Sequence, residues 1–267
     1  MIPPVEDREA WMDRVVESML ATWRTLARAN GAAMFEREGV FGIRNPRVRE
    51  RSVFNSVGYT DPEALLAARD DLAGFYAELG SAWTVWVPER DREVATALES
   101  AGHVLDAMPR AMGRPLAGVE EPDLSGIAWT ATGDMHAACQ INDHAYGIPE
   151  GTWLMGNGER PEGFRNYVAE LDGRPVATVA TVRDRDDCEI WSVATEPAAR
   201  GRGLSTALMR RAIWDAAREG CTTTTLQATK LGRPVYERVG FRDFGALGMW
   251  ELRPPELRGF AGRKPPA

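Results

Sequence analysis

The spacing of hydrophobic residues near the start of the chain predicts one long amphipathic helix. From Arg8 to Ala29, apolar residues recur three or four positions apart, which places them on one face of a helix. The residues on that face are Trp11, Val15, Val16, Met19, Leu20, Trp23 and Leu26. Asn30-Gly31 is a plausible stop, because glycine and asparagine tolerate the left-handed conformation that ends many helices.

The rest of the first half shows short strand and helix patterns. Asp61-Pro62 is a typical helix start, since aspartate caps the free N–H groups and proline fits the first turn. The predicted strands are 35–43, 52–59 and 83–87, and the predicted helices are 62–79 and 90–101. The segment from Gly113 to Gly126 is rich in glycine, proline and acidic residues, which is typical of a linker.

The second half of the chain also alternates between helix and strand patterns. Asp172-Gly173 is a typical hairpin turn between two strands. The predicted helices are 134–146, 203–219 and 233–239, and the predicted strands are 164–170, 176–182, 189–195, 222–228 and 247–252. From Pro254 onward proline and glycine are frequent, which predicts a loosely held, flexible tail.

Part of this element order occurs twice. Residues 62–116 and 201–252 both show a helix, a strand, a helix, a glycine, an aromatic ring and a strand. Gly102-His103 in the first copy corresponds to Gly240-Phe241 in the second. Two related halves would explain the length of the 267-residue chain, and chance agreement between two α/β segments is the alternative.

Composition narrows the function classes. A formal net charge of −7 argues against a nucleic-acid-binding surface, which needs clustered basic residues. Three widely separated cysteines are typical of reduced, structural residues, and without CxxC or HExxH spacing we expect no metal site. No apolar run approaches membrane-spanning length, and the N-terminus lacks a signal-peptide pattern. We therefore expect a cytoplasmic protein whose partners include neither a membrane nor nucleic acid.

The most informative segment runs from Val193 to Leu208, where a strand ends in a loop of small residues and a helix begins. Gly201 and Gly203 have no side chain to keep a ligand away from the backbone. N–H groups at the start of a helix bind phosphates, and Arg200 and Arg202 add positive charge. A P-loop or dinucleotide loop is excluded, because there is no Lys-Ser/Thr after the glycines and no third spaced glycine.

This segment resembles motif A of the GNAT acetyltransferases, Gln/Arg-x-x-Gly-x-Gly/Ala. Arg200, Gly203 and Ser205 occupy the motif positions, with serine in place of the final glycine or alanine. A second element follows at the family's usual distance, since Tyr236 to Phe241 is similar to its Tyr-x-x-x-Gly-Phe sequence. The resemblance covers roughly residues 128–252 and identifies this half as a GNAT domain.

The resemblance implies an α/β (α+β) GNAT fold, with a mixed, mostly antiparallel sheet flanked by helices, in two GNAT-like halves. The expected division is a degenerate N-terminal domain (1–118), a linker (119–126), a catalytic domain (127–253) and a tail (254–267). Acetyl-coenzyme A is the implied co-substrate, and its pantetheine arm is expected between strands 189–195 and 222–228. The implied binding residues are Val193, Ala194, Thr195, Arg200, Gly201, Arg202, Gly203, Leu204, Ser205 and Thr206.

By the same resemblance, Tyr236 is expected to protonate the departing thiolate, although it could instead only pack against the cofactor. The identity of the general base is left open, with three alternatives. Glu189, at the start of its predicted strand, is one candidate, with a solvated strand-end charge as the alternative. His144, on the helix that also carries Asp143 and Tyr146, is another, and ordered water could replace both. Trp153 and Trp191 are expected either to line a substrate pocket or to belong to the core.

The first half has lost the phosphate-binding loop. In the repeat alignment, residues 61–66 lie opposite Arg200 to Ser205. Pro62 removes an N–H donor there, Leu66 fills space, and Asp61 and Glu63 place negative charge where pyrophosphate would bind. We therefore predict that the first half does not bind coenzyme A.

The expected function is transfer of an acetyl group from acetyl-coenzyme A to a primary amine of a small molecule, by direct attack in a ternary complex enclosed by the two halves. A peptide or protein acceptor is one alternative, and a non-catalytic coenzyme-A-binding sensor or structural protein is another. The sequence is compatible with a monomer or a homodimer, and it leaves the acceptor open.

Overall fold

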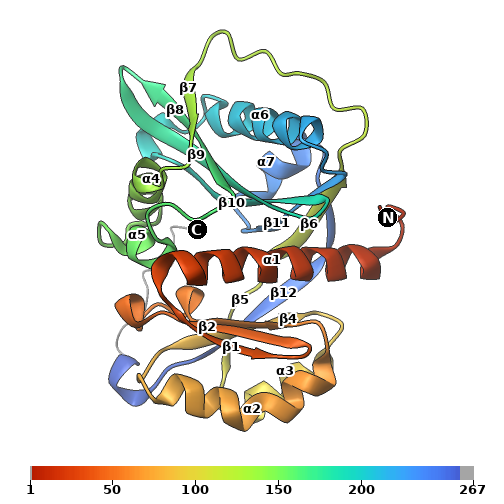
Figure 1. Cartoon of the computed structure of the whole chain (residues 1–267), viewed down its shortest axis with the longest axis vertical. Coiled ribbons are helices and arrows are strands. Elements are labelled where there is room, and N and C mark those ends of the chain that lie inside the picture. The colour runs from red at the N-terminus through yellow and green to blue at the C-terminus, as the bar shows by residue number, and fades with distance from the viewer. Residues whose placement is uncertain (1, 259–267) are drawn as a thin grey trace.

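The computed structural model describes residues 2–258, which form two helix-flanked lobes with a long helix between them (Figure 1). The helices are α1 (Arg8–Asn30), α2 (Pro62–Ala77), α3 (Arg92–Ser100), α4 (His136–Tyr146), α5 (Thr152–Asn157), α6 (Leu204–Arg218) and α7 (Arg233–Arg238). The strands of the first half are β1 (Ala33–Arg37), β2 (Val40–Arg44), β3 (Ser56–Tyr59), β4 (Trp83–Pro88), β5 (Val104–Ala107) and β6 (Arg110–Pro115). Those of the second half are β7 (Ala128–Thr132), β8 (Phe164–Leu171), β9 (Arg174–Asp184), β10 (Asp187–Thr195), β11 (Thr223–Ala228) and β12 (Arg242–Leu252).

The strands form one mixed, mostly antiparallel sheet in the order β1-β2-β3-β4-β12-β6-β11-β10-β9-β8-β7, with β5 paired to β12. The runs β1-β2-β3-β4 and β8-β9-β10-β11 have the same order, and each ends in a parallel pair. Helices α2 and α3 flank β4 in the chain as α6 and α7 flank β11. The repeated element order expected from the sequence is therefore present in the fold.

The two halves exchange their last strands. Strand β6 comes from the first half but pairs with β11, while β12 comes from the second half and pairs with β4. The exchanged strands also pair with each other, through residues 110–113 and 242–246. Cutting the chain within the expected linker, 119–126, would leave β6 on one fragment and its partners β11 and β12 on the other.

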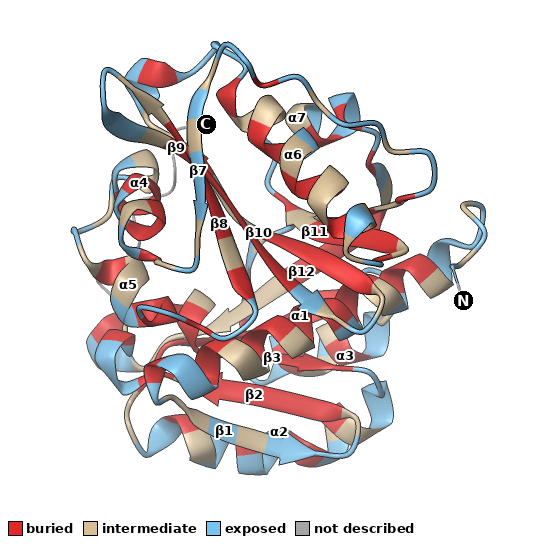
Figure 2. Ribbon diagram, turned by 45° about the horizontal axis from the view of Figure 1, so that its top comes forward, coloured by how far each residue is buried: buried red, intermediate tan, exposed pale blue. Residues whose placement is uncertain are grey.

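Helix α1 packs between the halves, with a continuous stripe of buried residues along its length (Figure 2). Asp7 caps its start by accepting a hydrogen bond from the N–H of Ala10, and Gly31 ends it at a φ of +70°. The helix contacts β2 and β3 of the first half and β9, β10 and β11 of the second. No helix in residues 2–258 is long and apolar enough to cross a membrane.

Several predicted boundaries were wrong. The expected strand 35–43 is the β1–β2 hairpin, whose turn contains Gly39 at a φ of +76°. This turn was not predicted, because apolar residues lie on both sides of it. Within 52–59, residues Ser52–Phe54 form a 3-10 helix before β3. The linker-like segment from Gly113 to Gly126 begins inside β6. Gly113 lies against the Trp11 ring, where an added Cβ atom would be 2.7 Å from it.

Three elements, β5, β7 and α5, had not been predicted at all, because each is short and only weakly patterned. The expected tail, 254–267, is described only up to residue 258. Pro255–Leu257 forms a 3-10 helix, and Leu257 is only 7% exposed, so this part of the tail packs against the protein. Residues 259–267 lie outside the described residues.

Candidate active site

The loop between β10 and α6 leaves the start of the helix open. Gly201 and Gly203 adopt φ angles of +79° and +76°, and an added Cβ atom would meet nothing within 4 Å at either position. Within residues 2–258, no side chain caps the start of α6 by a hydrogen bond. The first N–H groups of a helix have no intrahelical partner, so those of Leu204, Ser205 and Thr206 are available to an anion.

The equivalent helix start in the first half is closed. The carboxylate of Asp61 accepts hydrogen bonds from the N–H groups of Glu63 and Ala64, at 2.9 and 3.3 Å. This carboxylate occupies the anion position at the start of α2. Of the two helix starts, only that of α6 is free of a capping side chain.

Strands β10 and β11 separate directly beside this loop. Their parallel pairing covers Asp187–Glu189 and Thr223–Thr225, and the described pairing ends there. Beyond it β10 has an irregularity between Trp191 and Ala194, with Ser192 at a φ of +51°. Val193 lies within this irregularity and Ala194 and Thr195 follow it, in the part of β10 beyond the described pairing with β11.

The final motif position is tied to the end of β10. The hydroxyl groups of Ser205 and Thr195 form a hydrogen bond, which links the first turn of α6 to the strand. Arg200 donates hydrogen bonds to the carbonyl oxygens of Thr195 and Ala145, at 3.3 Å each. Serine at the position of glycine or alanine is thus accommodated, and it holds the loop against β10.

Glu189 lies at the point where β10 and β11 separate, and it is fully buried. The strand begins two residues earlier, at Asp187, so the alternative of a solvated strand-end charge was wrong. Thr22 of α1 and Gln227 of β11 donate hydrogen bonds to its carboxyl group, the latter at 2.9 Å. Burial raises the pKa of Glu189 to about 8, because water no longer solvates the charged form.

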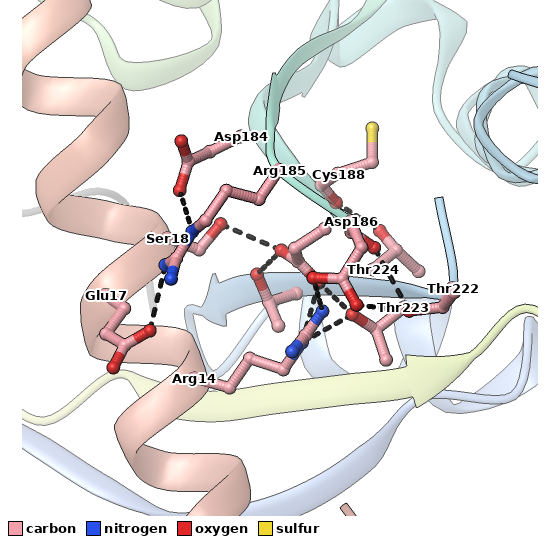
Figure 3. Close-up of polar contacts among 12 residues, drawn as sticks. Arg14, Glu17, Ser18, Asp184, Arg185, Asp186, Cys188, Thr222, Thr223 and Thr224 are labelled. Carbon is pink, nitrogen blue, oxygen red and sulfur yellow. Dashed lines mark hydrogen bonds and ion pairs between the residues drawn. The ribbon is translucent and has the colours of Figure 1, made fainter. Parts of the chain in front are cut away.

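A polar network beside Glu189 joins α1 to the second half. Asp187 accepts a hydrogen bond from Ser18 at 2.8 Å and another from Thr225 at 2.6 Å. Arg14 points toward Asp186 and binds its carboxylate at 2.7 Å (Figure 3). These contacts were not predicted, although Arg14, Ser18 and Thr22 recur every four residues along α1 and so lie on one face of the helix.

Tyr236 lies on α7 and is 7% exposed. Its ring packs against Phe241, with the ring centres 6.2 Å apart. Burial raises the pKa of Tyr236 well above its ordinary value, and the neighbouring Tyr146 adds to the shift. The phenol therefore keeps its proton at neutral pH, as a proton donor must.

His144 is exposed on α4, whereas Glu189 is fully buried. Its Nδ1 atom lies 2.8 Å from a carboxylate oxygen of Glu196, on the loop that leads to α6. Asp143 has a structural role, since its carboxylate accepts hydrogen bonds from the N–H groups of Gly151 and Trp153. The two candidate bases therefore lie in different surroundings, one enclosed and one exposed.

Aromatic rings gather on the α4–α5 side of β10. Trp153 stacks on Tyr146 with ring centres 5.8 Å apart, and it also contacts Trp191 and Phe54 edge-on. Phe54 comes from the first half. In the described part of the chain, the indole N–H groups of Trp153 and Trp191 are buried without a hydrogen-bond partner. Both tryptophans are half-buried, so they are not purely core residues.

Among residues 2–258, no group of three or more histidine, cysteine, aspartate or glutamate side chains could hold a metal ion. Cys139, Cys188 and Cys221 are free and buried.

Comparison with known proteins agrees with this geometry. Residues 134–241 match the model of the acetyltransferase (GNAT) family. An uncharacterized N-acetyltransferase of Methanocaldococcus jannaschii is 32% identical over 108 residues, which are 37% of this chain and 46% of that protein. The [ribosomal protein bS18]-alanine N-acetyltransferase of Salmonella typhimurium is 27% identical over 125 residues, 45% of this chain and 82% of that protein. The chain thus spans about half the length of the archaeal relative.

Solved structures extend the similarity to both halves. A GCN5-related N-acetyltransferase from Kribbella flavida has a TM-score of 0.67 at 18% identity, covering 90% of this chain and 94% of that one. A tandem GNAT protein from the clavulanic acid biosynthesis pathway has a TM-score of 0.53 at 13% identity, covering 90% and 95%. At these identities the similarity shows the fold. Residues 134–241 therefore form a domain of the acetyltransferase (GNAT) family, and most of the chain shares the fold of solved GNAT structures, one of them a tandem GNAT protein.

Proposed function

We propose that this protein transfers an acetyl group from acetyl-coenzyme A to a primary amine, with direct attack of the amine in a ternary complex. The observation that supports this best is the uncapped start of α6 beside the separation of β10 from β11. The pyrophosphate of the co-substrate fits the N–H groups of Gly201 to Thr206, with Arg200 and Arg202 supplying positive charge. Acetyl-coenzyme A brings the thioester, whose carbonyl carbon receives the amine.

The backbone of Val193, Ala194 and Thr195 would hold the pantetheine arm and polarise the thioester carbonyl. Backbone N–H groups that are fixed before reaction stabilise the negative charge that develops on this oxygen. This role needs no particular side chain, which is consistent with the small and apolar residues found there.

Proton transfer is assigned to Glu189 and Tyr236. Glu189 would accept a proton from the amine, directly or through water, because it lies where the two strands part and has a pKa of about 8. Tyr236 would donate a proton to the departing thiolate. His144 is the less favoured base, because its imidazole is engaged with Glu196 and lies on the exposed side of α4.

A small-molecule amine is the favoured acceptor. Helix α1 of the first half covers the face of the sheet that carries Glu189, and Phe54 of the same half contacts Trp153. Such covering restricts the entry of a long peptide. A peptide acceptor is the alternative that the Salmonella relative supports, since its name gives alanine of a ribosomal protein as its substrate.

Isothermal titration with acetyl-coenzyme A tests the proposal, using wild type, Gly203→Glu and the matched control Gly118→Glu. Gly118 also has a positive φ, of +72°, and open space around its Cβ position, but it lies in the connection between β6 and β7. We expect one site per chain, lost in Gly203→Glu and retained in Gly118→Glu. Thiol release on adding amines should follow in wild type. An absence of binding in wild type would refute the proposal, and binding without thiol release from any amine would favour a non-catalytic sensor.

A further inference from the structure

The degenerate first half contains a cavity of its own. Its volume is about 290 Å³, near the lower end of the range for small-molecule sites. Helices α2 and α3, strand β4 and the end of β12 surround it. Its lining combines the apolar residues Leu65, Leu72, Trp83, Val85, Leu98 and Leu252 with the exposed polar residues Arg69, Asp70 and Ser100. The cavity is separate from the capped start of α2, where Asp61 closes the former phosphate position.

His103 supplies a buried polar group to this lining. It is 5% exposed, and within the described residues neither of its ring nitrogen atoms has a hydrogen-bond partner. The ring meets Trp83 edge-on, with ring centres 4.8 Å apart, and the backbone N–H of His103 is fixed to the carbonyl of Leu98 at 3.0 Å. Burial lowers the pKa of the imidazole to about 4, so it is neutral at pH 7, with one donor and one acceptor nitrogen.

The repeat provides an internal comparison for this position. Phe241 follows Gly240 in the second half as His103 follows Gly102 in the first, and Phe241 is buried against Tyr236. An apolar ring therefore suits this position of the fold. Burying an imidazole without partners is unfavourable by about 1–3 kcal/mol relative to a satisfied group. A ligand that hydrogen-bonds the ring would remove this penalty.

We propose that the cavity binds a small, uncharged aromatic molecule bearing a hydroxyl group, of the phenol class. Its ring would pack on Trp83 and the surrounding leucines. Its hydroxyl group can both donate and accept a hydrogen bond, which matches a neutral imidazole. Leu252 of β12 pairs with Trp83 in the sheet, and β12 continues to β6 in the second half. A ligand here therefore touches a strand that both halves share.

Titration of the whole protein with para-cresol and para-xylene tests this inference, because the two probes differ only by a hydroxyl in place of a methyl group. Binding is followed by tryptophan fluorescence and by the imidazole NMR signals of uniformly labelled protein, with the signal of His103 assigned through His103→Phe. We expect saturable binding of para-cresol, about tenfold tighter than that of para-xylene, and a shift of the His103 signal.

Two variants make the test specific. In His103→Phe, which installs the residue used in the second half, the preference for para-cresol should disappear. In Ala97→Leu, which fills the cavity and keeps the histidine, both probes should be excluded. Circular dichroism confirms that each variant is folded, and acetyl-coenzyme A titration should be unchanged in both. No binding of para-cresol by wild type, an unmoved His103 signal at saturation, or a preference that survives in His103→Phe would overturn the inference. None of these results bears on acetyl-coenzyme A binding.

Discussion

The hydroxyl group of Thr22 donates a hydrogen bond to the carboxyl group of Glu189, and the two residues come from different halves of the chain. Thr22 lies on α1 and is fully buried with Glu189 beneath it. The first half thus sets the surroundings of the group to which we assign the general-base role. A first half whose corresponding helix start is closed by Asp61 can in this way still affect the surroundings of Glu189.

This contact leads to a prediction for the pH dependence of acetyl transfer. If Glu189 is the base, kcat/KM of wild type rises with pH and levels off above about pH 8, the pKa of its carboxyl group. Glu189→Gln should lower kcat by about 100-fold or more and remove this dependence, while acetyl-coenzyme A still binds. Thr22→Val should move the rise to higher pH, because the Thr22 hydrogen bond lowers the pKa.

Thr25→Val is the matched control for this prediction, since Thr25 lies on the same helix but is only half-buried. Steady-state kinetics between pH 6 and pH 9.5, a range of about two units around the pKa, would resolve the shift. An unchanged pH profile in Glu189→Gln would contradict the assignment and point to His144 or to water.

Tyr236→Phe removes the proposed proton donor and keeps the ring that packs on Phe241. We expect kcat to fall by about 100-fold, with little change in the affinity for acetyl-coenzyme A. The fall in kcat should be smaller for acceptors whose transition state carries less negative charge on the departing sulfur atom. Single-turnover kinetics and acetyl-coenzyme A titration measure the two quantities. A large loss of affinity with unchanged kcat would indicate that Tyr236 only packs against the co-substrate.

Asp61→Ala removes the side-chain cap of α2. Because the N–H groups of Glu63 and Ala64 lose their acceptor, the free energy of unfolding should fall by about 1 kcal/mol. The affinity for acetyl-coenzyme A in the second half should not change. Urea denaturation and calorimetric titration check the two expectations. The appearance of a second binding site in this variant would show that Asp61 alone had closed the first half.

His103 makes a further prediction about acid stability. Its pKa in the folded protein is about 4, below the ordinary value of 6.5, so the unfolded state binds a proton first as the pH falls. Stability is therefore lost as the pH decreases below 6.5. Between pH 7 and pH 5, wild type should lose about 2 kcal/mol relative to His103→Phe. Parallel urea denaturation of the two proteins at both pH values measures the difference, and an equal loss in both would mean that His103 is accessible to protons in the folded state.

Much of the local structure was readable from the sequence. The spacing of Trp11, Val15 and Met19 determined α1, and Asp61-Pro62 and Gly31 marked helix ends, because capping and positive φ depend on one residue and its near neighbours. The glycines before α6 and the later Tyr236 to Phe241 element were likewise visible, and they indicated the family. The closed start of α2 in the first half could also be predicted, because Asp61 accepts hydrogen bonds from N–H groups only two and three residues away.

Contacts between distant segments could not be read in the same way. The exchange of β6 and β12 depends on pairing across more than a hundred residues, and neither strand carries a local sign of its partner. Glu189 is buried only because α1, whose Thr22 is 167 positions away, covers it. His103 lies in a cavity where α2, α3, β4 and β12 meet, and among residues 2–258 its ring has no hydrogen-bond partner. The sequence by itself determined most of the helices and strands and the glycine loop before α6, since these follow from backbone sterics and nearby hydrogen bonds. The tertiary structure alone decided burial and pKa, because both depend on which remote segments exclude water from a side chain.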